Sequence, residues 1–155
     1  MPIGFDMQFK CEQFDALDTQ TLFTIMRGRV DVFVVEQECP YPELDDVDIA
    51  LNTRHLYTLS HGQLQTYARC YEKSAQYSAI GRVLVSESAR GNGYATLLIN
   101  EAIDCCKAQW PERDIYIGAQ TYLLDFYRSF GFEDYKSEYL EDGIPHQDMI
   151  LKLSK

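Results

Sequence analysis

The pattern of hydrophobic and polar residues predicts strands near the start of the chain and again in its middle. Ile3 to Lys10 alternates strictly, which is the two-residue period of a strand with one buried face. Arg54 to Ser60 and Leu64 to Tyr71 flank His61-Gly62, a turn signal that predicts an antiparallel hairpin. The largely apolar run Tyr77 to Val85 predicts a third strand beside this hairpin.

Two longer stretches carry the spacing of amphipathic helices. Apolar residues recur at intervals of three and four from Thr19 to Val35, and Asp18 or Thr19 can cap this helix. Cys39-Pro40-Tyr41-Pro42 ends it. A second apolar stripe runs from Leu97 to Cys106 and stops before Trp110-Pro111.

The last third of the chain alternates between short strands and one short helix. The predicted elements are a strand at Ile115 to Gly118, a helix at Leu123 to Phe130 closed by Gly131, and strands at Phe132 to Tyr139 and Met149 to Leu153. Hairpins come first and helical crossovers follow, so the order predicts a mixed α/β fold, in one domain over residues 1–155.

An acidic stretch after the first helix is predicted as a surface loop through Asp48 to Asn52. Asp45, Asp46 and Asp48 could attract a cationic amine, although a solvated loop is the simpler interpretation. Their spacing lacks the glycine and the distal glutamate of a calcium loop.

The charge balance narrows the classes of partner. The 155 residues include 24 acidic and 14 basic side chains, a formal net charge of -10, which disfavours binding to nucleic acid or an anionic membrane. A cationic partner is compatible with it. No run of 18 apolar residues and no secretion leader is visible, so we expect a cytoplasmic protein.

The cysteines predict neither a disulfide framework nor a zinc site. There are five, an odd number without C-x-x-C spacing, which fits a reducing compartment. A thiol hydrolase pairing Cys39 with His55 or His146 is an alternative function, but the chain lacks a nucleophile-elbow or oxyanion signature.

The most informative local motif is Arg90-Gly91-Asn92-Gly93-Tyr94-Ala95, between the strand that ends at Val85 and the second helix. Glycines let consecutive N–H groups face inward, and the positive end of the following helix dipole attracts phosphate. An R-x-x-G-x-A segment at a strand-to-helix junction therefore predicts a pyrophosphate site for an adenine-nucleotide-like cofactor.

Three segments in order resemble the acetyl-CoA motifs of the GNAT N-acetyltransferases. They are Ile80-Gly81-Arg82-Val83-Leu84-Val85, the Arg90 to Ala95 motif, and Phe126-Tyr127-Arg128-Ser129-Phe130-Gly131-Phe132. Further segments are similar to the ElaA subfamily: Phe33-Val34-Val35-Glu36-Gln37, Cys39-Pro40-Tyr41, Tyr116-Ile117-Gly118-Ala119-Gln120 and Glu141-Asp142-Gly143-Ile144-Pro145-His146. The resemblance covers nearly the whole chain.

The resemblance implies the GNAT acyl-CoA N-acyltransferase fold, with a mixed, mostly antiparallel sheet and helices on both faces. The strands from Ile80 and Ile115 would splay apart and admit the pantetheine arm of acetyl-CoA, by a form of strand addition. No metal is implied. The expected cofactor-binding residues are Val83, Leu84, Val85, Arg90, Gly91, Asn92, Gly93, Tyr94, Ala95, Thr96, Gln120 and Tyr127.

Tyr127 and Glu36 are the expected catalytic residues. By resemblance, the Tyr127 hydroxyl would protonate the departing CoA thiolate as general acid; by spacing alone, it would be a core aromatic on the apolar face of its helix. Glu36 near the end of the first helix is the candidate base, and a solvated helix-end carboxylate is the alternative.

The acceptor pocket is expected to include Glu36, Tyr41, His55, Arg69 and His146. The histidines titrate in the range useful for proton transfer, although a lone histidine is more often structural. The expected function is transfer of an acetyl group from acetyl-CoA to a primary amine of a small molecule or peptide. The alternatives are a non-catalytic acyl-CoA sensor or interaction module, and exposed strand edges leave a homodimer open.

Overall fold

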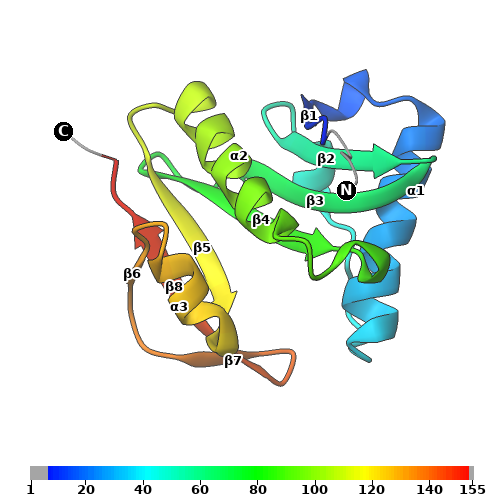
Figure 1. Ribbon diagram of the computed structural model, residues 1–155. Coiled ribbons are helices and arrows are strands. Elements are labelled where there is room, and N and C mark those ends of the chain that lie inside the picture. The colour runs from blue at the N-terminus through cyan, green and yellow to red at the C-terminus, as the bar shows by residue number, and fades with distance from the viewer. Residues whose placement is uncertain (1–6, 154–155) are drawn as a thin grey trace.

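The computed structural model describes residues 7–153, and the strands in this range form one sheet of eight (Figure 1). In spatial order they are β1 (Lys10–Glu12), β2 (Arg54–Ser60), β3 (Gln63–Glu72), β4 (Tyr77–Val85), β5 (Asp114–Gln120), β8 (Ile144–Leu151) and β6 (Glu133–Asp134), with β7 (Tyr139–Glu141) also paired to β8. Among these pairs only β4 and β5 run parallel. The predicted hairpin and the strand that follows it are confirmed.

The parallel pair separates part of the way along, as the resemblance implied. Pairing between β4 and β5 runs from Tyr77 opposite Asp114 to Ile80 opposite Ile117 and then stops. Beyond this point β4 continues to Val85 against β3 alone, and β5 continues to Gln120 against β8 alone. A bulge accompanies the separation, because Arg82 has a φ of 52° and the β3–β4 register shifts there. A wedge-shaped gap therefore opens within the sheet.

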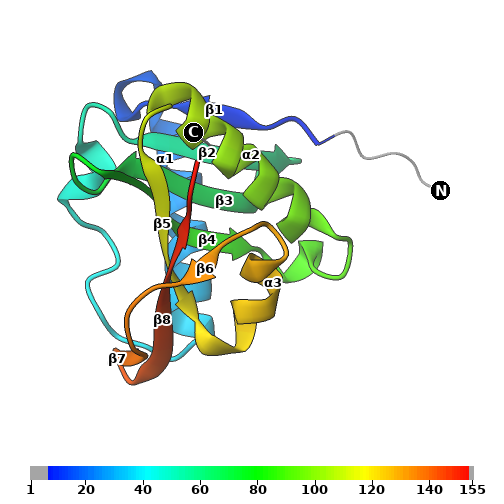
Figure 2. The ribbon, with the colours of Figure 1, turned by 90° about the vertical axis from the view of Figure 1, so that its left-hand side faces the viewer.

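Helices cover both faces of the sheet (Figure 2). α1 (Thr19–Arg29) is capped by Asp18, whose side chain accepts from the Thr21 amide at 2.7 Å, and it continues as a π-helical segment, Val30–Glu36. α2 (Tyr94–Gln109) and α3 (Leu124–Arg128) pack on the opposite face. The split is visible at two neighbours in β2: Leu56 belongs to the core under α2, and Tyr57 to the core under α1. Short 3-10 turns occupy Phe14–Ala16, Asp46–Ile49, Glu87–Ala89 and Thr121–Leu123.

Three predicted strands differ from the structure. Residues 1–6 lie outside the described part, and the described first strand begins only at Lys10. The single strand expected at Phe132 to Tyr139 is wrong, because Glu133–Asp134 pairs with β8 in one short stretch, Lys136 turns the chain with a φ of 67°, and Tyr139 already belongs to the separate strand β7. The last strand starts at Ile144 instead of Met149 and ends at Leu151.

The acidic stretch is held against the sheet by ion pairs, so the prediction of a solvated loop is wrong for Asp48. We call this group of paired charges the clasp; its members are Arg29, Glu43, Asp48, Arg69 and Arg82. The buried Arg29 guanidinium donates to Asp48 at 2.6 Å and to Glu43 at 2.8 Å. Arg69 donates to Asp48 at 3.0 Å, and Arg82 to Glu43 at 3.0 Å. Buried charges of this kind persist only when paired. These ion pairs join α1, β3 and β4 to the segment that carries Tyr41.

Candidate active site

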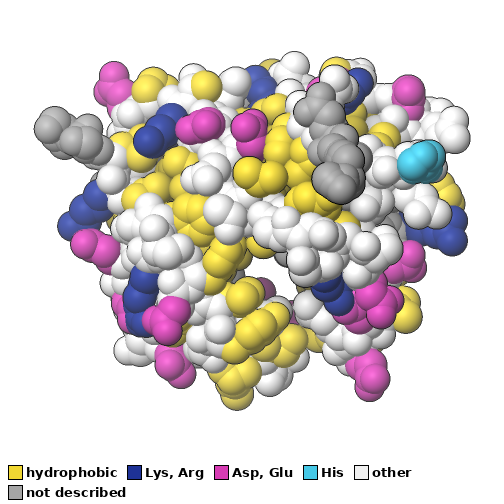
Figure 3. Space-filling model, viewed as in Figure 1, with side chains coloured by type: hydrophobic (Ala, Val, Ile, Leu, Met, Phe, Trp, Pro, Cys, Tyr) yellow, Lys and Arg dark blue, Asp and Glu magenta, His cyan; other side chains and the backbone are white. Residues whose placement is uncertain are grey.

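Two cavities meet at the gap between β4 and β5. The first, which we call the helix-end cavity, has a volume of about 500 Å³ and lies beside the start of α2. The second, the tyrosine-lined cavity, has a volume of about 540 Å³. Six residues line both cavities: Phe33, Gln37, Val83, Tyr122, Leu123 and Tyr127. Figure 3 shows a hollow in the face that carries α2 and α3, bordered by hydrophobic side chains.

The helix-end cavity contains most of the residues predicted to hold a cofactor. It is lined by Val83, Leu84, Val85, Arg90, Gly91, Gly93, Tyr94, Ala95 and Tyr127. Gly91 and Gly93 have φ values of +83° and +76°, which glycine adopts at little cost. Gly93 caps α2 and provides no side-chain acceptor, so the first turn keeps N–H groups for a ligand. A carbon atom added at either glycine would meet no atom within 4 Å.

Asn92 and Thr96 differ from the other predicted cofactor residues, because neither lines a cavity. The Asn92 amide donates to the carbonyls of Ala89 at 3.0 Å and Arg90 at 3.3 Å, so it holds the turn in shape. Gln120 lines the tyrosine-lined cavity instead of the helix-end cavity.

Arg90 is held by Glu36 at the edge of the helix-end cavity. Its guanidinium donates to the Glu36 carboxylate at 3.0 Å and to the Val85 carbonyl at 2.9 Å. The hydrogen bond from Arg90 lowers the pKa of Glu36, although burial opposes the shift. Glu36 does not line the tyrosine-lined cavity. The structure therefore does not support Glu36 as a base or as an acceptor-pocket residue.

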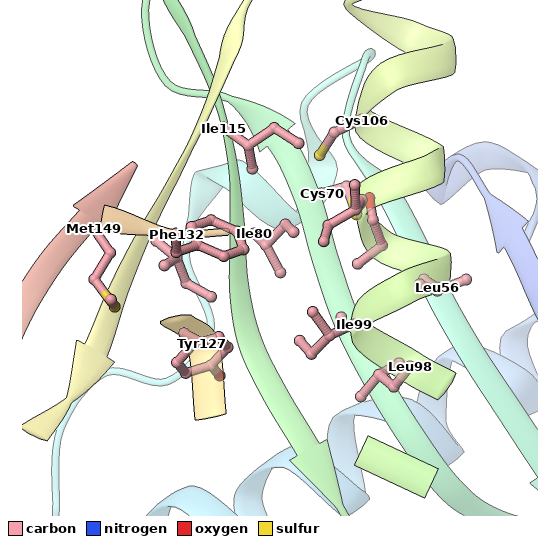
Figure 4. Packing of buried hydrophobic residues seen from close by; sticks show 14 of the residues in the cluster. Leu56, Cys70, Ile80, Leu98, Ile99, Cys106, Ile115, Tyr127, Phe132 and Met149 are labelled. Carbon is pink, nitrogen blue, oxygen red and sulfur yellow. Dashed lines mark hydrogen bonds between the residues drawn. The ribbon is translucent and has the colours of Figure 1, made fainter. Parts of the chain in front are cut away.

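Tyr127 forms the wall between the cavities. It comes from α3 and lies in the gap between β4 and β5, near Ile80 and Phe132 (Figure 4). Its ring packs edge-on against Phe126 and Phe132, and only 4% of the residue is exposed. The hydroxyl has no hydrogen-bond partner within residues 7–153, and burial raises the pKa of Tyr127. Tyr127 is therefore a core residue and also lines both cavities.

The tyrosine-lined cavity is aromatic and acidic. Its rings are Tyr41, Tyr71, Tyr116, Tyr122, Tyr127 and Tyr139, and its carboxylates are Glu141, Asp142 and Asp148. Asp148 accepts hydrogen bonds from the hydroxyls of Tyr116 and, at 2.7 Å, Tyr139. Burial, followed by these hydrogen bonds, raises the pKa of both tyrosines. The cations Lys73 and Arg82 also line this cavity, and the Lys73 ammonium lies 4.4 Å from the centre of the Tyr116 ring in a cation–π contact.

His146 lines the same cavity, on β8 opposite Gln120 of β5. Its Nδ1 lies 2.8 Å from the Ile144 carbonyl, which can only accept, so Nδ1 carries the hydrogen. In the neutral ring, Nε2 then keeps its lone pair. Its ring also stacks on Tyr139 with a centroid distance of 5.8 Å. His146 and Asp148 lie two positions apart on β8 and therefore share one face of the strand. The sequence does not predict this pair as strand residues, because the predicted strand starts only at Met149.

His55 and Arg69 lie in the core and line neither cavity, so the structure does not bring them to the predicted acceptor pocket. The Asp48 carbonyl accepts from His55 Nε2 at 2.9 Å, and the Tyr67 hydroxyl donates to Nδ1 at 2.6 Å. Arg69 is bound by Asp45 and Asp48. Both side chains thus bind residues of the clasp and its surroundings. Tyr41 instead lines the tyrosine-lined cavity, and its hydroxyl donates to Glu43.

Other site types receive no support from the described residues. The Cys39 thiol donates to the Asp142 carbonyl at 3.8 Å, and within residues 7–153 no hydrogen bond joins it to either candidate histidine. Within the same range, no three His, Cys, Asp or Glu side chains are grouped to hold a metal ion. None of the described helices has the length and apolar character needed to cross a membrane.

Comparisons with known proteins agree with this geometry. The family model described as "Acetyltransferase (GNAT) domain" matches residues 30–153. The ElaA protein of Escherichia coli is 38% identical over 135 residues, covering 86% of this chain and 88% of that protein. A UPF0039 protein of Schizosaccharomyces pombe is 39% identical over 150 residues, covering 96% of this chain and 99% of its own.

Solved structures give the same result. The crystal structure of an acyl-CoA N-acyltransferase from Pseudomonas aeruginosa superimposes with a TM-score of 0.91 at 34% identity, covering 95% of this chain and all of that one. Escherichia coli ElaA superimposes with a TM-score of 0.90, also at 34% identity and with the same coverage. The chain therefore belongs to the GNAT acetyltransferase family and has the fold of acyl-CoA N-acyltransferases.

Proposed function

We propose that the protein is an N-acetyltransferase that moves the acetyl group of acetyl-CoA directly to a primary amine. The observation that carries the proposal is the pair of cavities that share Tyr127 as a wall. A direct transfer between two substrates needs two openings that converge on one reacting centre. The gap between β4 and β5 provides this convergence, since the two strands separate beyond Ile80 and Ile117.

The acyl carrier belongs in the helix-end cavity. Gly91, Gly93 and the start of α2 would hold its diphosphate through N–H groups and the helix dipole. Val83 and Val85 would receive the extended arm at their main-chain groups, as in strand addition. Arg90 would also reach the diphosphate after exchanging Glu36 for it, because a diphosphate offers more charge and more acceptor oxygens than one carboxylate.

Tyr127 would serve as general acid. When the amine attacks the thioester carbonyl and the C–S bond breaks, negative charge collects on the departing sulfur. The phenol can donate its proton there, and its raised pKa keeps that proton in place at neutral pH. Contact with both cavities supports this role for Tyr127.

The acceptor belongs in the tyrosine-lined cavity, whose carboxylates and aromatic rings suit a cation. A bound ammonium must lose a proton before it attacks. For a lysine-type amine at pH 7 this costs about 4 to 5 kcal/mol, so a base is needed. We assign this task to His146, whose Nε2 keeps a lone pair while Nδ1 is held by the Ile144 carbonyl.

A panel of amines assayed for acetyl-CoA-dependent thiol release tests the proposal. We expect turnover with at least one primary amine, and a loss of about 10²- to 10⁴-fold in kcat for Tyr127→Phe with little change in coenzyme A affinity. Tyr122→Phe, in the same wall, is the matched control and should keep its kcat. Full turnover by Tyr127→Phe would remove that residue from the chemistry. Tight acetyl-CoA binding with no turnover on any amine would favour the sensor alternative.

A further inference from the structure

Cys11 and Cys105 bring their sulfur atoms together from distant parts of the chain. They are 94 positions apart, and the two Sγ atoms lie 2.8 Å from each other. Cys11 is exposed on the edge strand β1, and Cys105 is partly buried on α2. Figure 2 shows β1 close to the C-terminal half of α2, in agreement with the contact between the two sulfur atoms. The two thiols therefore form a solvent-accessible pair between two separate elements.

The other cysteines are arranged differently. Cys70 and Cys106 are buried and lie near the carbonyls of Ala102 at 3.8 Å and Ala79 at 4.0 Å. Cys39 lies in the tyrosine-lined cavity, away from the pair. Of the five thiols, only Cys11 and Cys105 combine access to solvent with a thiol partner at contact distance within residues 7–153.

The surroundings of Cys105 favour its thiolate form. Hydrogen bonds from the thiols of Cys11 and Cys70, together with the nearby Arg54 guanidinium, lower the pKa of Cys105. The same hydrogen bond raises the pKa of Cys11. A thiolate is the form of cysteine that attacks oxidants, and access controls how fast it does so.

We propose that Cys11 and Cys105 are a redox-modification site at which a hydroperoxide installs a reversible disulfide between β1 and α2. The Cys105 thiolate attacks one peroxide oxygen, forms a sulfenic acid and releases hydroxide or alkoxide. Cys11 sulfur then attacks the sulfenic sulfur, the S–S bond forms, and water leaves. In sum two thiols lose two electrons and two protons, and the peroxide is reduced to water, or to water and an alcohol.

The bond would fasten the edge of the sheet without entering the active site. β1 is a strand of three residues that pairs only with β2 among the described strands. Cys105 follows Tyr94 by eleven residues, about 16 Å along α2 from the end that borders the helix-end cavity. A cross-link over 94 positions restricts the unfolded chain strongly, so the oxidised form should unfold at a higher temperature.

The test treats the reduced full-length protein with a small excess of hydrogen peroxide, blocks the remaining thiols with a maleimide, and maps peptides by mass spectrometry. We expect a peptide pair linked through Cys11 and Cys105, and a fall in titratable thiols from five to three because the bond consumes two. A thiol reductant should restore all five. The melting temperature should rise by about 5 °C or more on oxidation.

Cys39→Ser is the matched control and should still lose two thiols. Cys11→Ser, at an exposed strand position, should fold and lose the cross-link, as should Cys105→Ser. The proposal is overturned if maleimide labels both residues after peroxide treatment. It is also overturned if the linked peptides contain Cys39 or join two chains, or if Cys105 is oxidised further without bonding to Cys11.

Discussion

Glu36 and His146 show how the neighbours of a single residue decide which proton chemistry it can perform. The Glu36 carboxylate is engaged by Arg90, which lowers its pKa, so it accepts a proton less readily than a free carboxylate. The His146 ring instead has one nitrogen anchored to a carbonyl and a second one that no described residue engages. Of the two residues, only His146 lines the cavity assigned to the amine.

Substitution of each residue by glutamine should therefore have opposite consequences. For a lysine-type acceptor we expect His146→Gln to lower kcat by about 10²-fold or more. Glu36→Gln should keep its kcat, and its KM for acetyl-CoA should fall by about two- to fivefold because an exposed negative charge near the diphosphate is removed. Steady-state kinetics with both substrates varied measures these effects. An equal loss of kcat in Glu36→Gln would return the base to that residue.

At the scale of elements, the start of α2 is the part that the proposed function assigns to the diphosphate. Gly93 has a left-handed backbone and faces open space, so a side chain there would be strained and would also project toward the proposed diphosphate. Gly62 in the hairpin turn has a similar φ of +74° and equally open surroundings, yet lines neither cavity. Substitutions at Gly93 and at Gly62 can therefore be compared to separate the effect of backbone strain from the effect of obstructing the ligand.

Gly93→Ala should lower the free energy of unfolding by about 1 to 2 kcal/mol and weaken coenzyme A binding by about tenfold or more. Gly62→Ala should cost a similar amount of stability and leave affinity unchanged. Gly93→Asn, which tolerates the left-handed region better, should recover part of the stability but not the affinity. Urea unfolding and calorimetry provide the two measurements. If Gly62→Ala weakened binding as much as Gly93→Ala, strain alone would explain both results.

The elements that could be predicted from sequence are those whose pattern reflects one buried face. β4 follows its predicted bounds, and the R-x-x-G-x-A segment lies at the predicted junction. The strand predicted at 132–139 is wrong because the aromatic residues of this segment do not alternate across a sheet: Phe132 enters the core, and Tyr135 packs against Tyr77 and Tyr116. Such contacts depend on distant residues and leave no local period.

At the scale of the whole molecule, the clasp around Asp48 links parts that no sequence pattern connects. Its ion pairs join Asp48 to Arg29, 19 positions earlier, and to Arg69, 21 positions later. From the sequence, Arg69 and His55 are predicted in the acceptor pocket and the aspartates in a surface loop, whereas His55, Arg69 and Asp48 are buried in the structure. The candidate catalytic residue Tyr127 and the glycine turn were accessible to sequence reasoning because their motifs are contiguous.

The clasp predicts how stability depends on pH. Burial lowers the pKa of His55, with smaller contributions from Arg29 and Arg69, so the folded protein favours the neutral ring. The unfolded chain, with a pKa of about 6.5, binds the proton first as the pH falls. The contribution of His55 is thus fully present above about pH 6.5 and is lost as the pH falls through the lower folded value.

Urea unfolding between pH 8 and pH 5 should show this decline in the wild-type protein. His55→Gln can keep one donor toward the Asp48 carbonyl and one acceptor for the Tyr67 hydroxyl, but it does not titrate. Its free energy of unfolding should therefore vary less with pH over the same interval. Identical slopes for the two proteins would show that His55 does not control this part of the curve.

Parallel neighbours cannot be joined by a tight turn, so α2 is both the connection from β4 to β5 and the element whose first turn borders the helix-end cavity. α2 therefore determines both how β4 connects to β5 and where the end that borders the helix-end cavity lies. Insertions or deletions of single residues within α2 would shift both at once. The hairpin between β2 and β3 carries no such double constraint, which makes it the more permissive place for grafting a tag or a reporter.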